Sequence, residues 1–329
     1  MESIGKSQQR RLSKISSLDA LEQEIHDQVE DLSSFARKLE KDDRFRRLDP
    51  SRMIFTGSGD SLASSLFAHY LSQMHALAAD PFELQQYPKI ARNKTVFITS
   101  VSGKTRTNIQ LARKIKGIAK KRIAITSNPQ GPLAKECDDV IQLRYRSPGI
   151  LTSGTASFSA SLLTVASLIR RLPKLDSLTI MERRAAEWAR SLWVHPRGPF
   201  LFVGSGIGYA LAMYAAFKVH EVLGLPAHYQ HTEQLGHSQL LSLKENQDNL
   251  FFLAPSRDEK TSEVFRVLSK NGFSAYLLKS DRRDPVLEAL EVIFSLQHLV
   301  LNLGRKMGLP ECAFLIGKKR LALSSRLIY

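Results

Sequence analysis

The feature that most restricts the fold is a short strand-like run followed by a glycine turn and a helix, which occurs twice. Met53–Thr56 leads into Gly57-Ser-Gly-Asp-Ser61, and Phe200–Val203 leads into Gly204-Ser-Gly-Ile-Gly208. Glycine tolerates the sharp backbone of a strand-to-helix turn. The repeat therefore predicts two copies of one α/β unit.

Further β-rich runs follow each copy and are separated by helical stretches. They are Thr95–Thr99, Arg122–Thr126 and Val140–Leu143 in the first copy, and Leu250–Leu253 and Phe273–Leu278 in the second. Strands that alternate with helices form a parallel sheet covered by helices on both faces. The expected fold class is α/β, with one parallel sheet in each half.

A chain of 329 residues is long enough for two domains of ordinary size. Apolar and charged residues alternate at helical spacing over Leu18–Leu39, so residues 1–49 are expected to be a helical lead-in. The helical stretch Ala156–Trp193 and the break at Pro196-Arg-Gly-Pro199 separate the two copies. The predicted domains are residues 50–195 and 196–329.

Charge and cysteine content restrict the partners and the compartment. Lys and Arg outnumber Asp and Glu by 47 to 32, and the net charge of +15 favours an acidic partner, either nucleic acid or a small phosphorylated molecule. No zinc-finger, RNP-type or basic-zipper pattern accompanies this charge, so no nucleic-acid partner is expected. Two cysteines, no secretory leader and no unbroken apolar run of about 18 residues indicate a cytoplasmic protein without a membrane partner.

The strand-like run Thr95–Thr99 continues into the loop Ser100-Val-Ser-Gly-Lys-Thr105 and then a helix. Hydroxyls, backbone N–H groups and a helix start favour an anion such as phosphate, although a serine-rich turn with an N-cap is the alternative. A nucleotide P-loop is excluded because Ile98 occupies its first glycine position. The Gly204 turn lacks the spacing of a dinucleotide fingerprint, so no redox cofactor is expected.

The stretch Ile207–Leu223 is apolar on all sides of a helix, yet it contains Lys218 and Glu221. Such a helix is buried, and buried charges are costly unless they pair, which their spacing allows. The pair is either structural or holds a carboxylate placed for proton transfer. Three histidines follow, and because their spacing matches no recognised ligand pattern, no metal is expected: His228, His231 and His237.

Together these motifs resemble the sugar isomerase (SIS) domain family, specifically the tandem pair in the isomerase half of glucosamine-6-phosphate synthase. Ser100–Thr105 resembles the family's phosphate loop, Gly57–Ser61 its Cys-Gly-Thr-Ser turn, and Leu151–Phe158 its Val-Ala-Ser-Thr-Lys-Ala-Phe stretch. The resemblance implies two SIS domains, each a parallel five-stranded sheet in a flavodoxin-like αβα sandwich. It implies Ser153 as a sugar contact and a phosphate site made of Ser58, Gly59, Ser61, Ser100, Ser102, Gly103, Lys104 and Thr105.

In the second half, Lys218-Val-His-Glu221 resembles the family's Lys-Leu-Lys-Glu, and His237 follows at the family's separation. The resemblance implies that Glu221 moves a proton between C1 and C2 of the sugar. It implies that Lys218 positions this carboxylate or stabilises negative charge, and that His237 opens the ring. In relatives this histidine comes from the neighbouring subunit, so a homodimer with a shared active site is implied.

The chain departs from the family pattern at two places. Lys104 replaces an acidic residue of the phosphate loop and adds positive charge. The family's tail carries a lysine that forms a Schiff base with the ketose, and Leu323–Tyr329 lacks it. Lys318 or Lys319, just upstream, is the candidate substitute.

The expected function is aldose–ketose interconversion on a hexose 6-phosphate, with glucosamine 6-phosphate and fructose 6-phosphate as the pair. Free ammonia would be taken up or released, because the resemblance does not extend to an amidotransferase domain. A phosphoglucose/phosphomannose isomerase is the alternative with the same fold. A non-catalytic sugar-phosphate sensor is the alternative of another class, which the short lead-in before Met53 disfavours.

Overall fold

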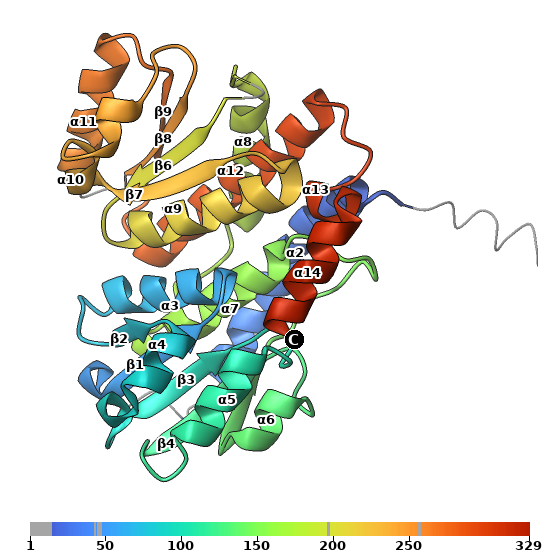
Figure 1. Ribbon diagram of the computed structural model, residues 1–329, viewed down its shortest axis with the longest axis vertical. Helices are drawn as coiled ribbons and strands as arrows, with labels where there is room; N and C mark the ends of the chain where they lie inside the picture. The colour runs from blue at the N-terminus through green and yellow to red at the C-terminus, as the bar shows by residue number, and fades with distance from the viewer. Residues whose placement is uncertain (1–14, 43, 45–47, 196–197, 255–257) are drawn as a thin grey trace, which may run out of the picture.

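The computed structural model describes residues 15–42, 44, 48–195, 198–254 and 258–329. Two parallel sheets occupy the lower and the upper half of Figure 1. The lower sheet has the order β2-β1-β3-β4-β5 and is formed by β1 (Met53–Gly57), β2 (Leu77–Ala79), β3 (Thr95–Thr99), β4 (Lys121–Thr126) and β5 (Asp139–Gln142). The α/β class and the five strands expected for the first half are confirmed.

The upper sheet has four strands, so the expectation of five is wrong for the second half. Its order is β7-β6-β8-β9, with β6 (Phe200–Gly204), β7 (Ala227–His231), β8 (Asn249–Ala254) and β9 (Ala275–Lys279). After β9 the chain enters the long apolar helix α12 (Pro285–Lys306). This helix returns to the interior, and no segment equivalent to β5 follows among the described residues.

The two strand-to-helix turns have the same backbone geometry. Gly59 has φ 60° and ψ −129°, and Gly206 has φ 55° and ψ −129°. Each turn leads from a central strand into a helix, α3 (Asp60–Leu71) or α9 (Ile207–Lys218). Positive φ costs glycine little, which explains the residue at both positions.

Helices form three layers around the two sheets (Figure 1). Between the sheets lie α2 (Ser17–Glu40), α3, α7 (Thr155–Ile169), α9 and α12, with α8 (Leu178–Ser191) packed on α12. Outside the first sheet lie α4 (Pro81–Gln86), α5 (Arg106–Lys114) and α6 (Pro132–Glu136). Outside the second lie α10 (Thr232–Leu235) and α11 (Glu259–Lys270), and the chain ends in α13 (Ala313–Ile316) and α14 (Lys318–Ile328).

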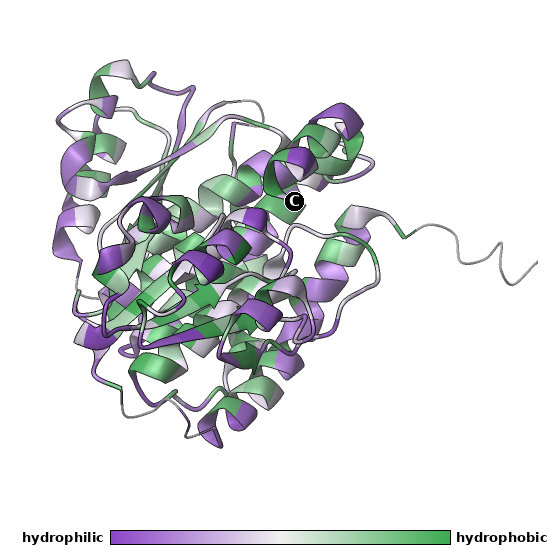
Figure 2. Cartoon of the chain, turned by 60° about the horizontal axis from the view of Figure 1, so that its bottom comes forward, coloured by the Kyte–Doolittle hydropathy of each residue, from purple (hydrophilic) through white to green (hydrophobic). Residues whose placement is uncertain are grey.

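The helices between the sheets share one apolar core. Phe55 and Phe97 of the first sheet and Phe202 and Phe251 of the second all belong to it. In Figure 2 the apolar residues gather on the strands and helices in the middle of the molecule. The two halves are therefore joined through their inner faces.

Two expected helices differ from the structure. The stretch Ala156–Trp193 forms α7 and α8, because the chain leaves the helix near Pro173, whose ring cannot continue it. The stretch Ile207–Leu223 is α-helical only to Lys218 and closes with a π-helical turn, Val219–Leu223.

The predicted domain boundaries fall partly outside the described residues. Residues 1–14, 43 and 45–47 of the expected lead-in, and Pro196 and Arg197 at the expected boundary, are among those not described. The remaining lead-in forms α2, which packs into the shared core. The division of the chain into two domains stays a prediction.

One described helix, α12, has the length and hydropathy of a membrane span. Its apolar window is 78% buried inside the protein, and α12 packs against α2, α8 and α9. It is placed as a core helix.

Candidate functional site

The loop Ser100–Thr105 connects β3 to α5, as the sequence predicts. Gly103, at φ 65°, donates its N–H to the Ser100 carbonyl at 3.0 Å and makes the turn. The Ser100 and Thr105 hydroxyls are 3.1 Å apart, and the Lys104 N–H donates to Ser102 Oγ at 3.2 Å. No described side chain caps the start of α5, so its first N–H groups face the loop without a side-chain partner among the residues that the structure places. An anion fits such a helix start.

The turn after β1 lies beside this loop. The Ser58 hydroxyl donates to Asn108 Oδ1 of α5 at 3.3 Å. Because β1 and β3 are parallel neighbours, Gly57 pairs with Thr99 and the two loops leave the sheet at the same edge. The predicted phosphate residues of both loops are thus brought together.

The charged centre of the site is Lys218, whose side chain is completely buried. Its ammonium donates to Asp60 Oδ2 at 2.8 Å, to Glu221 Oε2 and to the Ser153 carbonyl. It also lies over the ring of Tyr214, 5.3 Å from the centroid. The ion pair that the helical spacing of Lys218 and Glu221 predicts is present, and Ser153 is beside it.

Burial governs the protonation of this cluster. Loss of hydration raises the pKa of Asp60 to about 7; the Lys218 ammonium opposes that rise and the Glu221 carboxylate adds to it. Burial alone would lower the pKa of Lys218, but the two carboxylates outweigh it and the pKa is raised. Lys218 is therefore an ammonium. The Glu221 side chain is 41% exposed, so this carboxylate is open to a substrate.

Several buried side-chain oxygens near the carboxyl end of the first sheet have no hydrogen-bond partner within the described part of the chain. They belong to the ends of β1 and β3, to α3 and to the start of α7: Thr56 Oγ1, Asp60 Oδ1, Thr99 Oγ1, Ser153 Oγ and Thr155 Oγ1. Buried polar groups usually have partners. A polar ligand would supply them.

A chain of buried amides leads away from the cluster. Tyr214 stacks on Phe158, and its hydroxyl accepts a hydrogen bond from Gln297 at 3.0 Å. Gln297 in turn accepts from Gln28 at 2.5 Å, and Gln28 accepts from the Ser159 hydroxyl at 2.8 Å. Helices α2, α7, α9 and α12 are connected through these contacts.

The structure does not bring His237 to Glu221 within one chain. Its side chain is 69% exposed just after α10, where it lies 3.5 Å from Glu233. His231 stacks on Tyr209 at 3.5 Å, and burial lowers its pKa. In the described part of the chain, no three His, Cys, Asp or Glu side chains gather as metal ligands would.

Lys318 and Lys319 are exposed at the start of α14. Neither ammonium has a hydrogen bond or ion pair to a described residue. The segment that contacts the π-helical turn is instead α13, since a Cβ on Gly224 would lie 2.8 Å from the Ala313 Cβ. At its far end, α14 reaches the phosphate loop region, where Arg106 donates to the Arg326 carbonyl at 2.7 Å.

Sequence reasoning gave no role to Asp60, the second carboxylate on Lys218. It lies in the quoted glycine turn, directly after a strand, where ligand-binding residues of parallel sheets occur. That position was the available signal. Its partner is 158 residues away in the sequence, so their contact has no local pattern.

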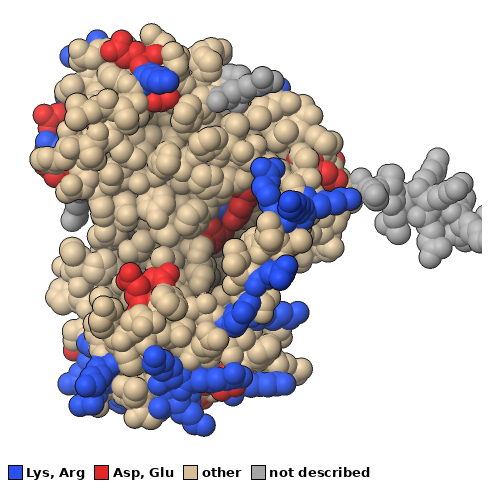
Figure 3. Space-filling model, viewed as in Figure 1, with Lys and Arg blue, Asp and Glu red and all other residues tan. Residues whose placement is uncertain are grey.

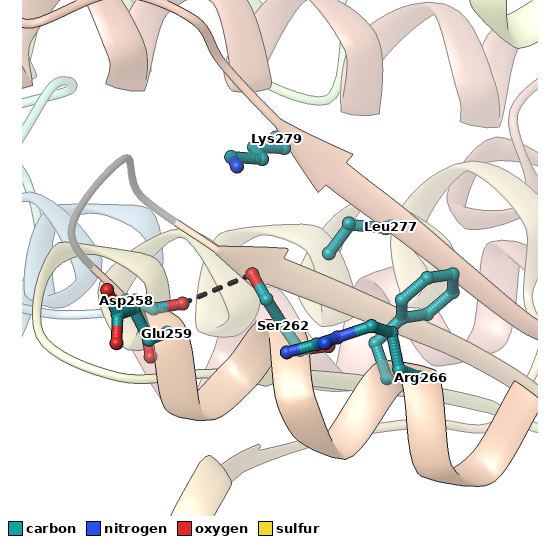
Figure 4. Close-up of a pocket in the computed structure, with 7 residues that line it drawn as sticks. Asp258, Glu259, Ser262, Arg266, Leu277 and Lys279 are labelled. Carbon is teal, nitrogen blue, oxygen red and sulfur yellow. Dashed lines mark hydrogen bonds between the residues drawn. The ribbon is translucent and has the colours of Figure 1, made fainter.

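The surface has a hollow between the two halves, with acidic side chains deep inside and Lys and Arg side chains along its right rim (Figure 3). A separate pocket of about 500 Å³ lies between α11 and β9, lined by Asp258, Glu259, Ser262, Phe265, Arg266, Leu277 and Lys279 (Figure 4). It contains none of the predicted site residues. Its Asp258 carboxylate already caps α11 through the Thr261 N–H at 2.9 Å.

The curated proteins to which this chain is similar in sequence all have the same name. Over 284 residues the chain is 23% identical to glutamine–fructose-6-phosphate aminotransferase (isomerizing) of Pyrococcus horikoshii. The aligned region covers 77% of this chain and 45% of that protein. Over 182 residues it is 24% identical to the protein of that name from Clostridium acetobutylicum, covering 48% and 29%. The chain spans less than half the length of these relatives.

Among solved structures, glucosamine-6-phosphate deaminase of Thermotoga maritima has a TM-score of 0.74 at 18% identity, covering 89% of this chain and 96% of that one. At this low sequence identity, the structural similarity shows a shared fold and no more. Residues 48–170 match the SIS domain family. This stretch contains the Gly57–Ser61 turn, the Ser100–Thr105 loop and the start of α7, so the similarity to the SIS domain family lies in the first half of the chain.

Proposed function

We propose that the protein is an aldose–ketose isomerase acting on a hexose 6-phosphate, and that it converts glucosamine 6-phosphate to fructose 6-phosphate and ammonia. The observation that carries this proposal is the Lys218–Glu221 pair, in which a buried ammonium holds a carboxylate that remains open to a ligand. The SIS domain and the phosphosugars in the names of the relatives support it. The same relatives support the broader proposal of a phosphosugar isomerase, whatever its substrate.

The phosphate would bind at the start of α5. The hydroxyls of Ser100, Ser102 and Thr105 and the uncapped N–H groups form an anion site, to which Lys104 adds positive charge. Ser58, Gly59 and Ser61 approach it from the neighbouring turn. The sugar would then extend past Ser153 toward Glu221.

Glu221 would act as the base. It takes the proton from C2 of the open-chain amino sugar and returns it to C1, while a second proton passes from the amine to the C1 oxygen, which gives the 2-imine. Water adds to this imine, and fructose 6-phosphate and ammonia leave. Lys218 holds Glu221 in place.

Ring opening is assigned to His237 of a second copy of the chain. Within one copy the His237 side chain is exposed, so it is available to the active site of a neighbouring subunit. Lys318 or Lys319 as a Schiff-base lysine stays a prediction.

Incubation with single substrates tests the proposal. The protein is given glucosamine 6-phosphate, and ammonia and fructose 6-phosphate are measured; they should appear in equal amounts. In a second reaction it is given fructose 6-phosphate alone. Formation of glucose 6-phosphate without ammonia would instead support the phosphoglucose isomerase alternative, and binding without turnover would support a sensor.

The variant Glu221→Gln separates chemistry from binding. General acid–base groups typically contribute about 10²- to 10⁴-fold in rate, so kcat should fall at least about 100-fold. Binding of the sugar phosphate should persist, because the phosphate loop is untouched. The matched control is Glu187→Gln, an exposed carboxylate of α8, which should keep full activity. A fully active Glu221→Gln variant would remove Glu221 from the mechanism.

A further inference from the structure

The turn itself does not require an aspartate at position 60. The equivalent turn of the second half has the same backbone geometry and carries Ile207 at that position. Among the described residues the Asp60 side chain does not cap α3, because Oδ2 accepts from Lys218 and Oδ1 has no hydrogen-bond partner. A carboxylate beside a buried lysine therefore needs a reason other than folding of the turn.

Only one Asp60 oxygen has a hydrogen-bond partner in the part of the chain that the structure describes. Oδ2 accepts from Lys218 at 2.8 Å, whereas Oδ1 is buried and has no partner among the described residues. The unpartnered hydroxyls of Ser153 and Thr155 belong to the loop that approaches Asp60, because a Cβ on the intervening Gly154 would lie 3.3 Å from Oδ2. Burial of an unsatisfied carboxylate oxygen is unfavourable, so this side suits a hydrogen-bond donor from a ligand.

The charges of the site are unequally distributed. At one end, and above about pH 7, two carboxylates, Asp60 and Glu221, share the single ammonium of Lys218, which leaves an excess of negative charge. At the other end, the start of α5 and Lys104 favour an anion. A ligand that is negative at one end and positive at the other complements this arrangement.

We propose that Asp60 is a specificity-determining residue that accepts a hydrogen bond from a protonated amine at the reacting end of the substrate, and so selects an amino-sugar phosphate over a neutral hexose phosphate. This inference rests on the proposed function. Asp60 also holds Lys218, and a role limited to that contact would weaken all ligands equally.

The test compares two unreactive ligands at pH 7.5 by calorimetry: 2-amino-2-deoxyglucitol 6-phosphate and glucitol 6-phosphate. They differ only in an ammonium against a hydroxyl. A charge-assisted hydrogen bond corresponds to about a tenfold or larger preference for the amine in the wild-type protein. Asp60→Asn should reduce this preference to less than about threefold, with the loss confined to the amine ligand.

Two controls accompany the comparison. Asp176→Asn makes the same charge change at an exposed position between α7 and α8 and should keep the wild-type preference. Inorganic phosphate should bind wild type and Asp60→Asn equally, which shows that the variant is folded with its phosphate loop intact.

The outcomes distinguish this inference from the proposed function. An unchanged preference in folded Asp60→Asn overturns the role of Asp60. Equal binding of both ligands by wild type overturns it as well, even if the variant does not fold, and leaves the isomerase proposal standing. Failure of wild type to bind either ligand contradicts both.

Discussion

At the residue scale, the central fact is a buried lysine between two carboxylates from opposite halves of the chain. Removing one partner of a buried charge typically costs about 3–5 kcal/mol, because the remaining charge stays in the interior unpaired. Lys218 keeps Glu221 and the Ser153 carbonyl when Asp60 is neutralised. Because Lys218 is not left unpaired, we expect a protein with a neutral residue at position 60 to fold.

The raised pKa of Asp60 predicts a pH dependence of stability. The folded state holds a proton on Asp60 up to about pH 7, whereas the unfolded state releases it near 3.8. Stability from this group is therefore fully present below about pH 4 and is lost as the pH rises toward and through 7. Chemical unfolding at several pH values between 4 and 8 should show a falling contribution that Asp60→Asn removes. Parallel curves for the two proteins would contradict the shift.

The Lys218–Glu221 contact could be predicted because it is local. Charges three residues apart in an apolar helix must pair or be expelled, and the sequence displays both conditions. Asp60 satisfies no such pattern, since only the folded chain places it on Lys218. The exposed position of Lys318 and Lys319 likewise depends on where α14 packs, which residue types near the tail do not specify.

At the element scale, the π-helical turn Val219–Leu223 explains why the predicted helix and the observed one differ. The Gly224 N–H donates to the Val219 carbonyl at 3.1 Å, five residues back, and Gly224 has φ 67°. One extra residue in the turn moves Glu221 relative to Lys218, and π-helical turns are frequent at functional sites. Apolar periodicity cannot reveal this insertion.

The strands show how far sequence patterns reach. Buried central strands such as β3 and β8 read as apolar runs and were predicted, whereas the edge strands β2 and β7 were not. β7 reads Ala-His-Tyr-Gln-His, which has the polar composition of a partly exposed strand. The second half has the strand order of the first without its last strand, and a second SIS domain there stays a prediction.

The chain of buried amides gives a stability prediction for α12. Gln297→Leu leaves the Gln28 amide and the Tyr214 hydroxyl without their partner, and each unsatisfied buried group costs about 1–3 kcal/mol. The free energy of unfolding in urea should fall by at least about 1 kcal/mol. Gln86→Leu, an exposed amide at the end of α4, should change it by less than about 0.5 kcal/mol. Equal effects of the two substitutions would show that these buried amide hydrogen bonds contribute nothing to stability.

At the scale of the whole molecule, the proposed active site, shared between two subunits, predicts complementation. In a dimer built from Glu221→Gln and His237→Ala subunits, one of the two sites keeps both residues. Random mixing of the two inactive variants should therefore restore about a quarter of wild-type activity. The mixture is refolded together and assayed with glucosamine 6-phosphate. Absence of recovery, with a dimer present by size-exclusion chromatography, would place both residues in one subunit's site.

The shared core between the sheets has a further consequence for folding. A chain cut after His195 would leave each piece with inner helices whose apolar faces only the other piece covers. We expect the two pieces to aggregate when made separately and to form one soluble complex when made together. Because α12 of the later piece packs on α2 of the earlier one, a helix made late in synthesis completes the packing of a helix made early.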